Sequence, residues 1–357
     1  MSLMQSSSIN RTQTILIILL IAIAGLLIRL VFYPYNIPVA ADAMDYFSYS
    51  MALARGDIFP DGYLINKFGW SVFLSSFFAI SNATEMIDFM NIQRIVSMIV
   101  SVATIIPLYY LIKNFYKKEV AIIAASLFIF SPKIIENSLL GISDPLFIFL
   151  ISFSIMFVFI RNSKYYYLSY IFASFAFIVR QEGILILIPL ILFFFIKKNF
   201  SVKTITKLGI GIISFSLIVL LSNFLLVSGM DNVSIFDTVI HAMEFSEQNI
   251  VIENKDGTDE IGTISGDKIE FLKNSILKYS MYSGWILLPN LVFFVILSII
   301  VIKKKISVNR IIIFIFLAVL SLTSLFAFGK GIGDLRYLFV LIPIYVFFSA
   351  YGIDYLY

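Results

Sequence analysis

The stretch 68-FGWSVFLSSFFAI-80 decides how this chain is threaded through a membrane, because its length is too short for a clear span. At about 13 residues it has the length of an interfacial or re-entrant helix, whereas a span needs about 20 apolar residues. Around it, 60% of the 357 residues are hydrophobic, against about 45–50% in soluble domains. The sequence therefore predicts an all-α polytopic membrane protein, with residues 1–357 forming one integral-membrane domain.

The positions of the basic residues indicate which threading is correct, because Lys and Arg are enriched in cytoplasmic linkers. If 68–80 does not cross, the short basic linkers lie on the same side as Arg11. That side then holds 14 of the 26 Lys and Arg residues and only two acidic residues, Glu119 and Asp354. If 68–80 crosses, every later linker moves away from Arg11. We therefore expect both termini inside, 68–80 in the outer interface, and ten spans. The expected spans are 15–32, 92–112, 119–137, 144–160, 165–180, 183–196, 207–228, 285–302, 310–328 and 336–354.

Two outer loops are long in this arrangement, and the inner linkers are short. The loops cover 33–91 and 229–283, and they divide the domain into a core at 1–228 and C-terminal helices at 284–357. Because long loops can present polar chemistry, we expect an active site on the extracytoplasmic face of the cell membrane. The absence of cysteine excludes disulfide and thiol chemistry. The net charge of +4 reflects membrane orientation and does not indicate nucleic-acid binding.

The first outer loop contains the stretch 40-AADAMDYFSYSMALARG-56, which carries two acidic residues, Asp42 and Asp45. Because they are three residues apart, they share one face of a helix and can point into one pocket. Charge near membrane depth is costly unless it is paired or hydrated, so ionisable residues at span ends are candidates for function. Those at the same outer level are Lys67, Arg94, Glu136, Asp144, Arg180, Glu182, Asp334 and Arg336. Alternatively, each could be an interfacial anchor or part of a local salt bridge, and Asp45 could be only a helix-start residue.

Acids and arginines on one leaflet suit the attack of a hydroxyl group on a sugar carried by a lipid phosphate. A carboxylate removes the proton, and cations hold the departing phosphate. The catalytic candidates are Asp42 and Asp45. The donor-phosphate candidates are Arg180, Arg336, Arg94 and Lys67, and the supporting candidates are Glu136, Asp144, Glu182 and Tyr46. The sequence shows no complete metal-ligand set, although the acidic pair could bind a divalent cation through its oxygens.

Several motifs occur in a familiar order along most of the chain. They are 42-DAMDYFSYSMALARG-56, 66-NKFGWSVFL-74, 92-IQRIVSMIVSVATIIPLYYLIK-113, 143-SDPLF-147, 179-VRQEG-183 and 335-LRYLFVLIP-343. This order resembles the GT-C superfamily of integral-membrane glycosyltransferases, in the branch similar to dolichyl-phosphate-mannose protein mannosyltransferases. The chain departs from that family in having Phe68 where proline is common, and in having D-x-x-D where many relatives have adjacent acids.

The resemblance implies a GT-C-type bundle of about ten transmembrane helices with juxtamembrane helices on the outer face. It also implies that Asp42 is the general base and that Arg180 and Arg336 face the lipid phosphate, although the spacing of the acids leaves Asp42 and Asp45 open for the leading role. The expected donor is a polyprenyl-phosphate monosaccharide, and the expected acceptor is a lipid-linked glycan or a protein. Direct displacement would invert the anomeric centre. The alternative is a transporter or flippase of lipid-linked sugars, for which we find none of the usual inverted repeats.

Overall fold

The computed structural model describes residues 10–57, 68–160, 165–197, 202–227, 249–253, 259–263, 268–301 and 308–357. The described elements are helices, apart from one antiparallel hairpin of β1 (Asn249–Glu253) and β2 (Asp259–Thr263). The predicted all-α class is therefore confirmed, with this hairpin as a small addition inside the second long loop.

The helices of the first half are α1 (Arg11–Val31), α2 (Asp42–Ala54), α3 (Gly69–Ile80), α4 (Met86–Ala103), α5 (Ile105–Lys113), α6 (Lys118–Ile129), α7 (Pro132–Leu139), α8 (Asp144–Phe159) and α9 (Tyr166–Val179). Those of the second half are η2 (Gln181–Ile186), α10 (Leu187–Lys197), α11 (Val202–Val227), α13 (Lys268–Leu287), α14 (Val292–Val301), α15 (Val308–Gly329), η4 (Leu335–Leu341) and α16 (Ile342–Leu356).

The chain is an integral multi-pass membrane protein. Among the described residues, five helical segments are long and apolar enough to cross a bilayer, and a sixth is added if the bent pair of α13 and α14 counts as one. Four shorter apolar helices accompany them. The total of ten spans stays a prediction, since length and composition alone do not show which of the shorter helices cross.

The segment that decides the threading forms α3, which has 12 residues and is therefore about 18 Å long. This is well short of the hydrocarbon core of about 30 Å. Its first residue, Gly69, lies against the end of α9, where an added Cβ atom would be only 2.7 Å from the backbone nitrogen of Val179. This close approach places α3, and α2 packed on it, beside the turn that follows α9.

Several predicted boundaries differ from the structure; for example, α4 begins at Met86 and α11 at Val202, earlier than the predicted starts at 92 and 207. The predicted span 119–137 is divided into α6 and α7, because Ser131 precedes Pro132 and adopts an extended backbone (φ −68°, ψ 121°). The predicted loop 229–283 includes most of α13, so the helical region begins earlier than expected. The predicted span 285–302 starts inside α13 and is interrupted before α14, with a bend of 113°; Pro289 lies in this break and cannot continue a regular helix.

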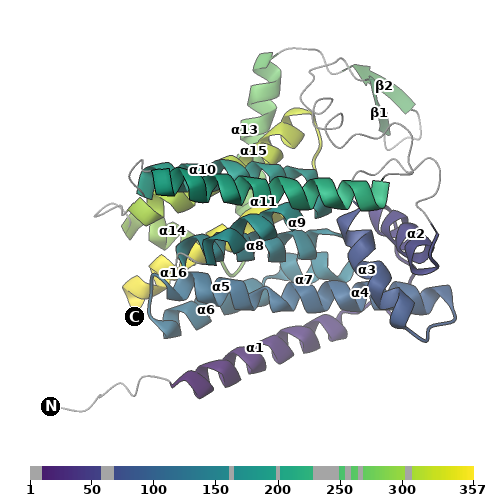
Figure 1. The fold of residues 1–357 in the computed structure, drawn as a ribbon, viewed down its shortest axis with the longest axis horizontal. Coiled ribbons are helices and arrows are strands. Elements are labelled where there is room, and N and C mark those ends of the chain that lie inside the picture. The colour runs from purple at the N-terminus through teal and green to yellow at the C-terminus, as the bar shows by residue number, and fades with distance from the viewer. Residues whose placement is uncertain are drawn as a thin grey trace.

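Figure 1 shows how the bundle is arranged around the opening motif. The short helices α2 and α3 lie at one end of the bundle, on the right in this view. The beginning of α1 and the C-terminal Tyr357 lie at the opposite end, on the left. Helices α2 and α3 are thus separated from both described chain ends by the length of the bundle.

Candidate active site

Asp42 is the first residue of α2, and its side chain is exposed. Ala41 before it has φ 50°, a sharp turn that ends the loop and begins the helix. Acidic residues in a first turn are favoured because the helix dipole is positive there. The Asp42 Oδ2 atom forms an ion pair of 3.1 Å with Nη1 of Arg336, 294 residues further along the chain. The first outer loop and the last helical region therefore meet at this carboxylate.

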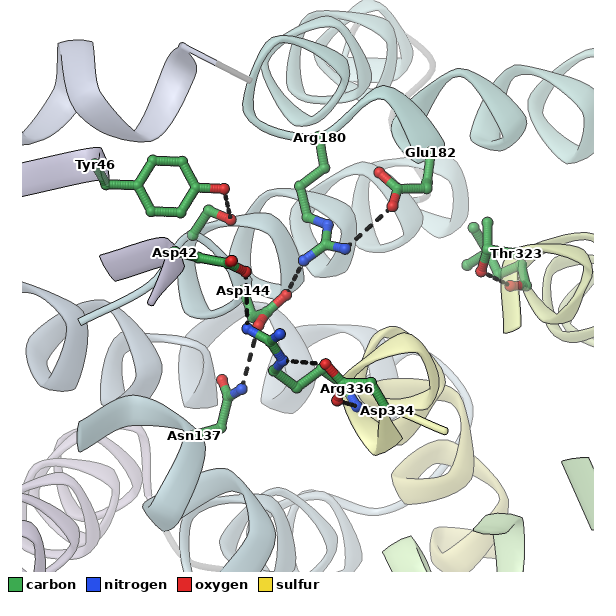
Figure 2. A network of polar contacts seen from close by, with 11 residues as sticks. Asp42, Tyr46, Asn137, Asp144, Arg180, Glu182, Thr323, Asp334 and Arg336 are labelled. Carbon is green, nitrogen blue, oxygen red and sulfur yellow. Dashed lines mark hydrogen bonds and ion pairs between the residues drawn. The ribbon is translucent and has the colours of Figure 1, made fainter. Parts of the chain in front are cut away.

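Arg336 lies at the start of η4 and is held by a second carboxylate, that of Asp334. The Oδ1 atom of Asp334 accepts a hydrogen bond of 2.9 Å from the backbone N–H of Arg336, which caps the helix start. Its Oδ2 atom accepts a hydrogen bond of 2.6 Å from Nε of the same arginine. The guanidinium of Arg336 thus lies between Asp334 and Asp42, as Figure 2 shows.

A second arginine, Arg180, lies between two further carboxylates. It follows α9 in extended conformation (φ −149°, ψ 129°), which turns its side chain toward the start of α8. There it pairs through Nη1 with the buried carboxylate of Asp144, and its Nη2 atom lies 3.1 Å from Oε1 of Glu182. Asn137 of α7 donates from Nδ2 to the other oxygen of Asp144 at 3.3 Å.

The two arginines line one pocket, which has a polar and an apolar wall. The polar wall contains Asp144, Arg180, Glu182, Thr323 and Arg336. The apolar and aromatic wall is formed by Phe147, Ile148, Tyr337, Phe339 and Val340. The lining thus combines two cations with apolar side chains, the chemistry that would contact a ligand with an anionic group and an apolar part.

Tyr46 connects the opening motif to this pocket. It lies one helical turn after Asp42, is buried, and places its hydroxyl 3.2 Å from Oγ of Ser143, the residue before Asp144. Burial raises the pKa of the Tyr46 phenol, which therefore stays neutral and available for hydrogen bonding at physiological pH.

Other predicted site residues lie outside this network. Asp45 is exposed and forms no ion pair with a described residue. Arg94 donates from its guanidinium to the backbone oxygens of Ile37 and Pro38, and so holds the loop before α2.

One further predicted residue, Glu136, also lies outside the network. Glu136 is exposed and pairs with Lys133 on its own helix, with 3.0 Å between the charged atoms. Lys67 lies outside the described residues.

Two buried polar residues were not predicted from the sequence. Gln93 donates from Nε2 to the backbone oxygens of Ala43 (2.9 Å) and Gly141 (2.7 Å), so it links α2 to the turn before Asp144. Arg29 of α1 is fully buried and donates to the hydroxyls of Ser101 and Ser138. Polar side chains inside apolar runs are unusual enough to have indicated both positions, although not their partners.

The predicted cation site at Asp42 and Asp45 lacks a full ligand set. The Asp42 carboxylate is engaged by Arg336, and the described part of the chain contains no group of three or more His, Cys, Asp or Glu side chains that could hold a metal ion. Calcium takes six to eight oxygen ligands, and magnesium prefers octahedral coordination. The cation therefore stays a prediction, and no step below depends on it.

Comparison with known proteins supports the resemblance. Residues 77–223, less than half of the chain, match the family model described as dolichyl-phosphate-mannose-protein mannosyltransferase. No curated protein matches the chain. Among solved structures, it is similar to the oligosaccharyltransferase of Archaeoglobus fulgidus in the apo form, with a TM-score of 0.60, 12% identity and coverage of 97% of this chain and 51% of that one.

A second structure is that of the archaeal oligosaccharyltransferase AglB from Archaeoglobus fulgidus in complex with an inhibitory peptide and a dolichol-phosphate. Its TM-score is 0.57 at 12% identity, with 95% of this chain and 50% of that chain covered. Our chain thus spans about half the length of these structures. The predicted resemblance is confirmed: the chain has the fold of the GT-C glycosyltransferases, and its residues 77–223 match the dolichyl-phosphate-mannose-protein mannosyltransferase family.

Proposed function

We propose that this protein is an inverting glycosyltransferase, which moves a monosaccharide from a polyprenyl-phosphate donor to an acceptor hydroxyl on the extracytoplasmic side of the membrane. One observation carries the proposal. The exposed carboxylate of Asp42 meets Arg336 at a pocket that is also lined by Arg180, so a proton acceptor and two phosphate-binding cations from distant segments share one place (Figure 2).

The donor would bind with its phosphate toward the arginines. An arginine suits this role because its planar fork donates two parallel hydrogen bonds and stays charged. The apolar wall of the pocket, with Phe147 and Phe339 among its members, offers contact to the sugar or the first isoprene units. Arg336 is the better candidate for direct phosphate contact, because Arg180 is buried between Asp144 and Glu182.

Asp42 would act as the general base. It accepts the proton of the acceptor hydroxyl while the acceptor oxygen forms a bond to the anomeric carbon and the bond from that carbon to the phosphate oxygen breaks. The electron pair of the broken bond leaves with the polyprenyl phosphate, where the arginines stabilise the negative charge. Attack and departure on opposite faces of the sugar invert the anomeric centre.

The kinds of substrate are supported by the comparisons. The family model is described by its dolichyl-phosphate-mannose donor, and one structural neighbour is bound to a peptide and a dolichol-phosphate. For this chain we propose a polyprenyl-phosphate sugar as donor and a lipid-linked glycan or a protein as acceptor.

The test is an assay of sugar transfer by the purified protein. The protein in detergent is incubated with radiolabelled polyprenyl-phosphate monosaccharides, each combined with a peptide or a lipid-linked glycan as acceptor. We expect labelled acceptor with at least one donor, with the anomeric configuration inverted when the product is analysed by NMR. The same protein in liposomes tests the transporter alternative. Movement of lipid-linked sugar across the bilayer, without any glycosidic product from any acceptor, would overturn the proposal.

A further inference from the structure

We propose that Asp334 competes with the donor phosphate for Arg336, so that donor binding moves Arg336 from the carboxylates to the phosphate and releases Asp42 to accept a proton. This inference rests on the proposed function and assigns Asp334 as a positioning residue that sets donor affinity.

The guanidinium group of Arg336 is already bonded to two carboxylates. Its Nε atom donates to Asp334 at 2.6 Å and its Nη1 atom lies 3.1 Å from Asp42. A guanidinium group has two edges for a bidentate hydrogen bond, Nε with Nη2 and Nη1 with Nη2, and on Arg336 each edge has one donor engaged by a carboxylate. A phosphate that binds either edge of Arg336 in a bidentate manner must therefore replace one of these carboxylates.

The carboxylates and guanidinium groups of the network do not balance in charge. The network contains four carboxylates, those of Asp42, Asp144, Glu182 and Asp334, but only two guanidinium groups. An anionic donor would approach a group that is already negative, unless one arginine exchanges a carboxylate partner for the phosphate. Such exchange is favourable only if the abandoned carboxylate can be hydrated.

The solvent exposure of the side chains indicates which arginine can exchange a carboxylate partner for the phosphate. The Asp144 side chain is only 5% exposed, so a loss of Arg180 would leave a buried charge without its cation. Asp334 and Asp42 are 30% and 57% exposed, so water can solvate both after Arg336 leaves. Arg336 itself is 33% exposed, against 13% for Arg180. Arg336 is thus the arginine that can exchange its carboxylate partners for the phosphate, whereas Arg180 stays bound to Asp144 and Glu182.

The exchange leaves the fold of η4 intact. Asp334 holds the helix start through a separate hydrogen bond, from the backbone N–H of Arg336 to Oδ1. Of the two hydrogen bonds between Asp334 and Arg336, only the one between Oδ2 and Nε has to break. Once Arg336 turns to the phosphate, the Oδ2 atom of Asp42 loses the partner that occupied it and becomes available to the acceptor hydroxyl. Donor binding would thereby activate the base.

The test is a binding measurement that does not require sugar transfer. A polyprenyl phosphate without sugar is titrated into the protein in detergent micelles, and the Kd is measured for the parent and for Asp334→Asn. Asparagine is also a good N-cap, so the variant keeps the helix start and loses the competing charge. We expect the Kd to fall by about threefold to tenfold, at most about 1.4 kcal/mol. A merely structural role of Asp334 predicts weaker binding.

Two controls separate competition from a general electrostatic effect. Asp88→Asn removes the same charge from an exposed acid in the first turn of α4, and its Kd should equal that of the parent. In the background of Arg336→Ala, Asp334→Asn should give no gain, since the cation that they compete for is absent. If Asp334→Asn does not fold, Asp334→Ser supplies the same comparison with another N-cap residue.

Failure of this inference can be distinguished from failure of the proposed function. An unchanged or larger Kd in Asp334→Asn, or a gain that persists without Arg336, overturns the exchange while leaving the transferase proposal in place. A parent protein that binds no polyprenyl phosphate overturns both.

Discussion

Asp42 and Asp45 belong to the same helical turn but have different surroundings. Asp42 is paired with Arg336 at the pocket, whereas Asp45 is exposed and forms no ion pair with a described residue. The only described influence of Asp45 is on Tyr49, where burial is the main cause of a raised pKa and the negative charge of Asp45 adds to it. The D-x-x-D spacing left the leading role open, and these surroundings favour Asp42.

The first prediction compares the two acids directly. Asp42→Asn keeps the shape of the side chain but removes the proton acceptor, so kcat should fall by about 10²–10⁴-fold, the usual contribution of a general base. The Kd for polyprenyl phosphate should not increase. Asp45→Asn should cost far less. Initial rates at saturating donor measure both effects, and a larger loss in Asp45→Asn would assign the base to that residue instead.

The second prediction concerns the buried pair of Arg180 and Asp144. Arg180→Met should destabilise the protein by about 3–5 kcal/mol, because it leaves a buried carboxylate without its cation. Adding Asp144→Asn should recover much of this loss, since the neutral amide needs no cation. Unfolding in mixed micelles of detergent and SDS measures the free energies. Equal stability of the single and double variants would show that the pair does not stabilise the fold.

At the scale of elements, Gln93 holds the site together from outside the pocket. Its amide group joins Ala43, beside Asp42, to Gly141, three residues before Asp144. The Gly141 oxygen also accepts a hydrogen bond of 3.1 Å from Nε1 of Trp70 in α3. The start of α2, with Asp42, and the start of α8, with Asp144, are therefore connected through α3 and α4. The distance between Asp42 and Asp144 depends on these buried hydrogen bonds.

The third prediction removes that connection. Gln93→Leu has similar bulk but no N–H group, so it leaves the Ala43 oxygen without this donor, at a cost of about 1–3 kcal/mol. A shift of α2 against α8 should lower kcat by about 10-fold or more, since misplacement of about 1 Å can cost 10²-fold.

Ser97→Ala is the matched control, since Ser97 lies one turn further along α4 and its buried hydroxyl has no hydrogen-bond partner among the described residues. It should keep the activity of the parent. Full activity in Gln93→Leu would show that the hydrogen bonds of Gln93 do not position Asp42 and Asp144.

Six of the predicted site residues come together because each flanks an apolar helix at the same end of the bundle. These are Asp42, Tyr46, Asp144, Arg180, Glu182 and Arg336. A linear pattern of helices and polar ends is enough to predict such a set. The partners of Gln93 and the serine partners of Arg29 were not predictable, since these hydrogen bonds join residues 48–109 positions apart inside the bundle. The same limit explains Arg94, whose charge indicated phosphate although its partners are backbone oxygens.

At the scale of the whole molecule, cationic side chains meet aromatic rings near the C-terminus. Lys117, between α5 and α6, lies 4.9 Å from the ring centre of Tyr357, and Arg310 lies 4.3 Å from that of Tyr351. Helix α2, whose first residue Asp42 pairs with Arg336, lies at the other end of the bundle (Figure 1). This separation agrees with the positive-inside argument, in which basic linkers gather on the cytoplasmic side.

The last prediction tests the orientation of the bundle, and it depends on whether α3 crosses the membrane. The chain contains no cysteine, so Thr84→Cys and Lys117→Cys each introduce a single thiol, one just after α3 and one between α5 and α6. If α3 lies in the outer interface, a membrane-impermeant maleimide should label position 84 on intact cells and should label 117 only after permeabilisation. If α3 crosses, the result is reversed, since every segment after it changes sides. Labelling of 117 alone on intact cells would place Arg180 and Arg336 on the cytoplasmic side and would refute the extracytoplasmic active site.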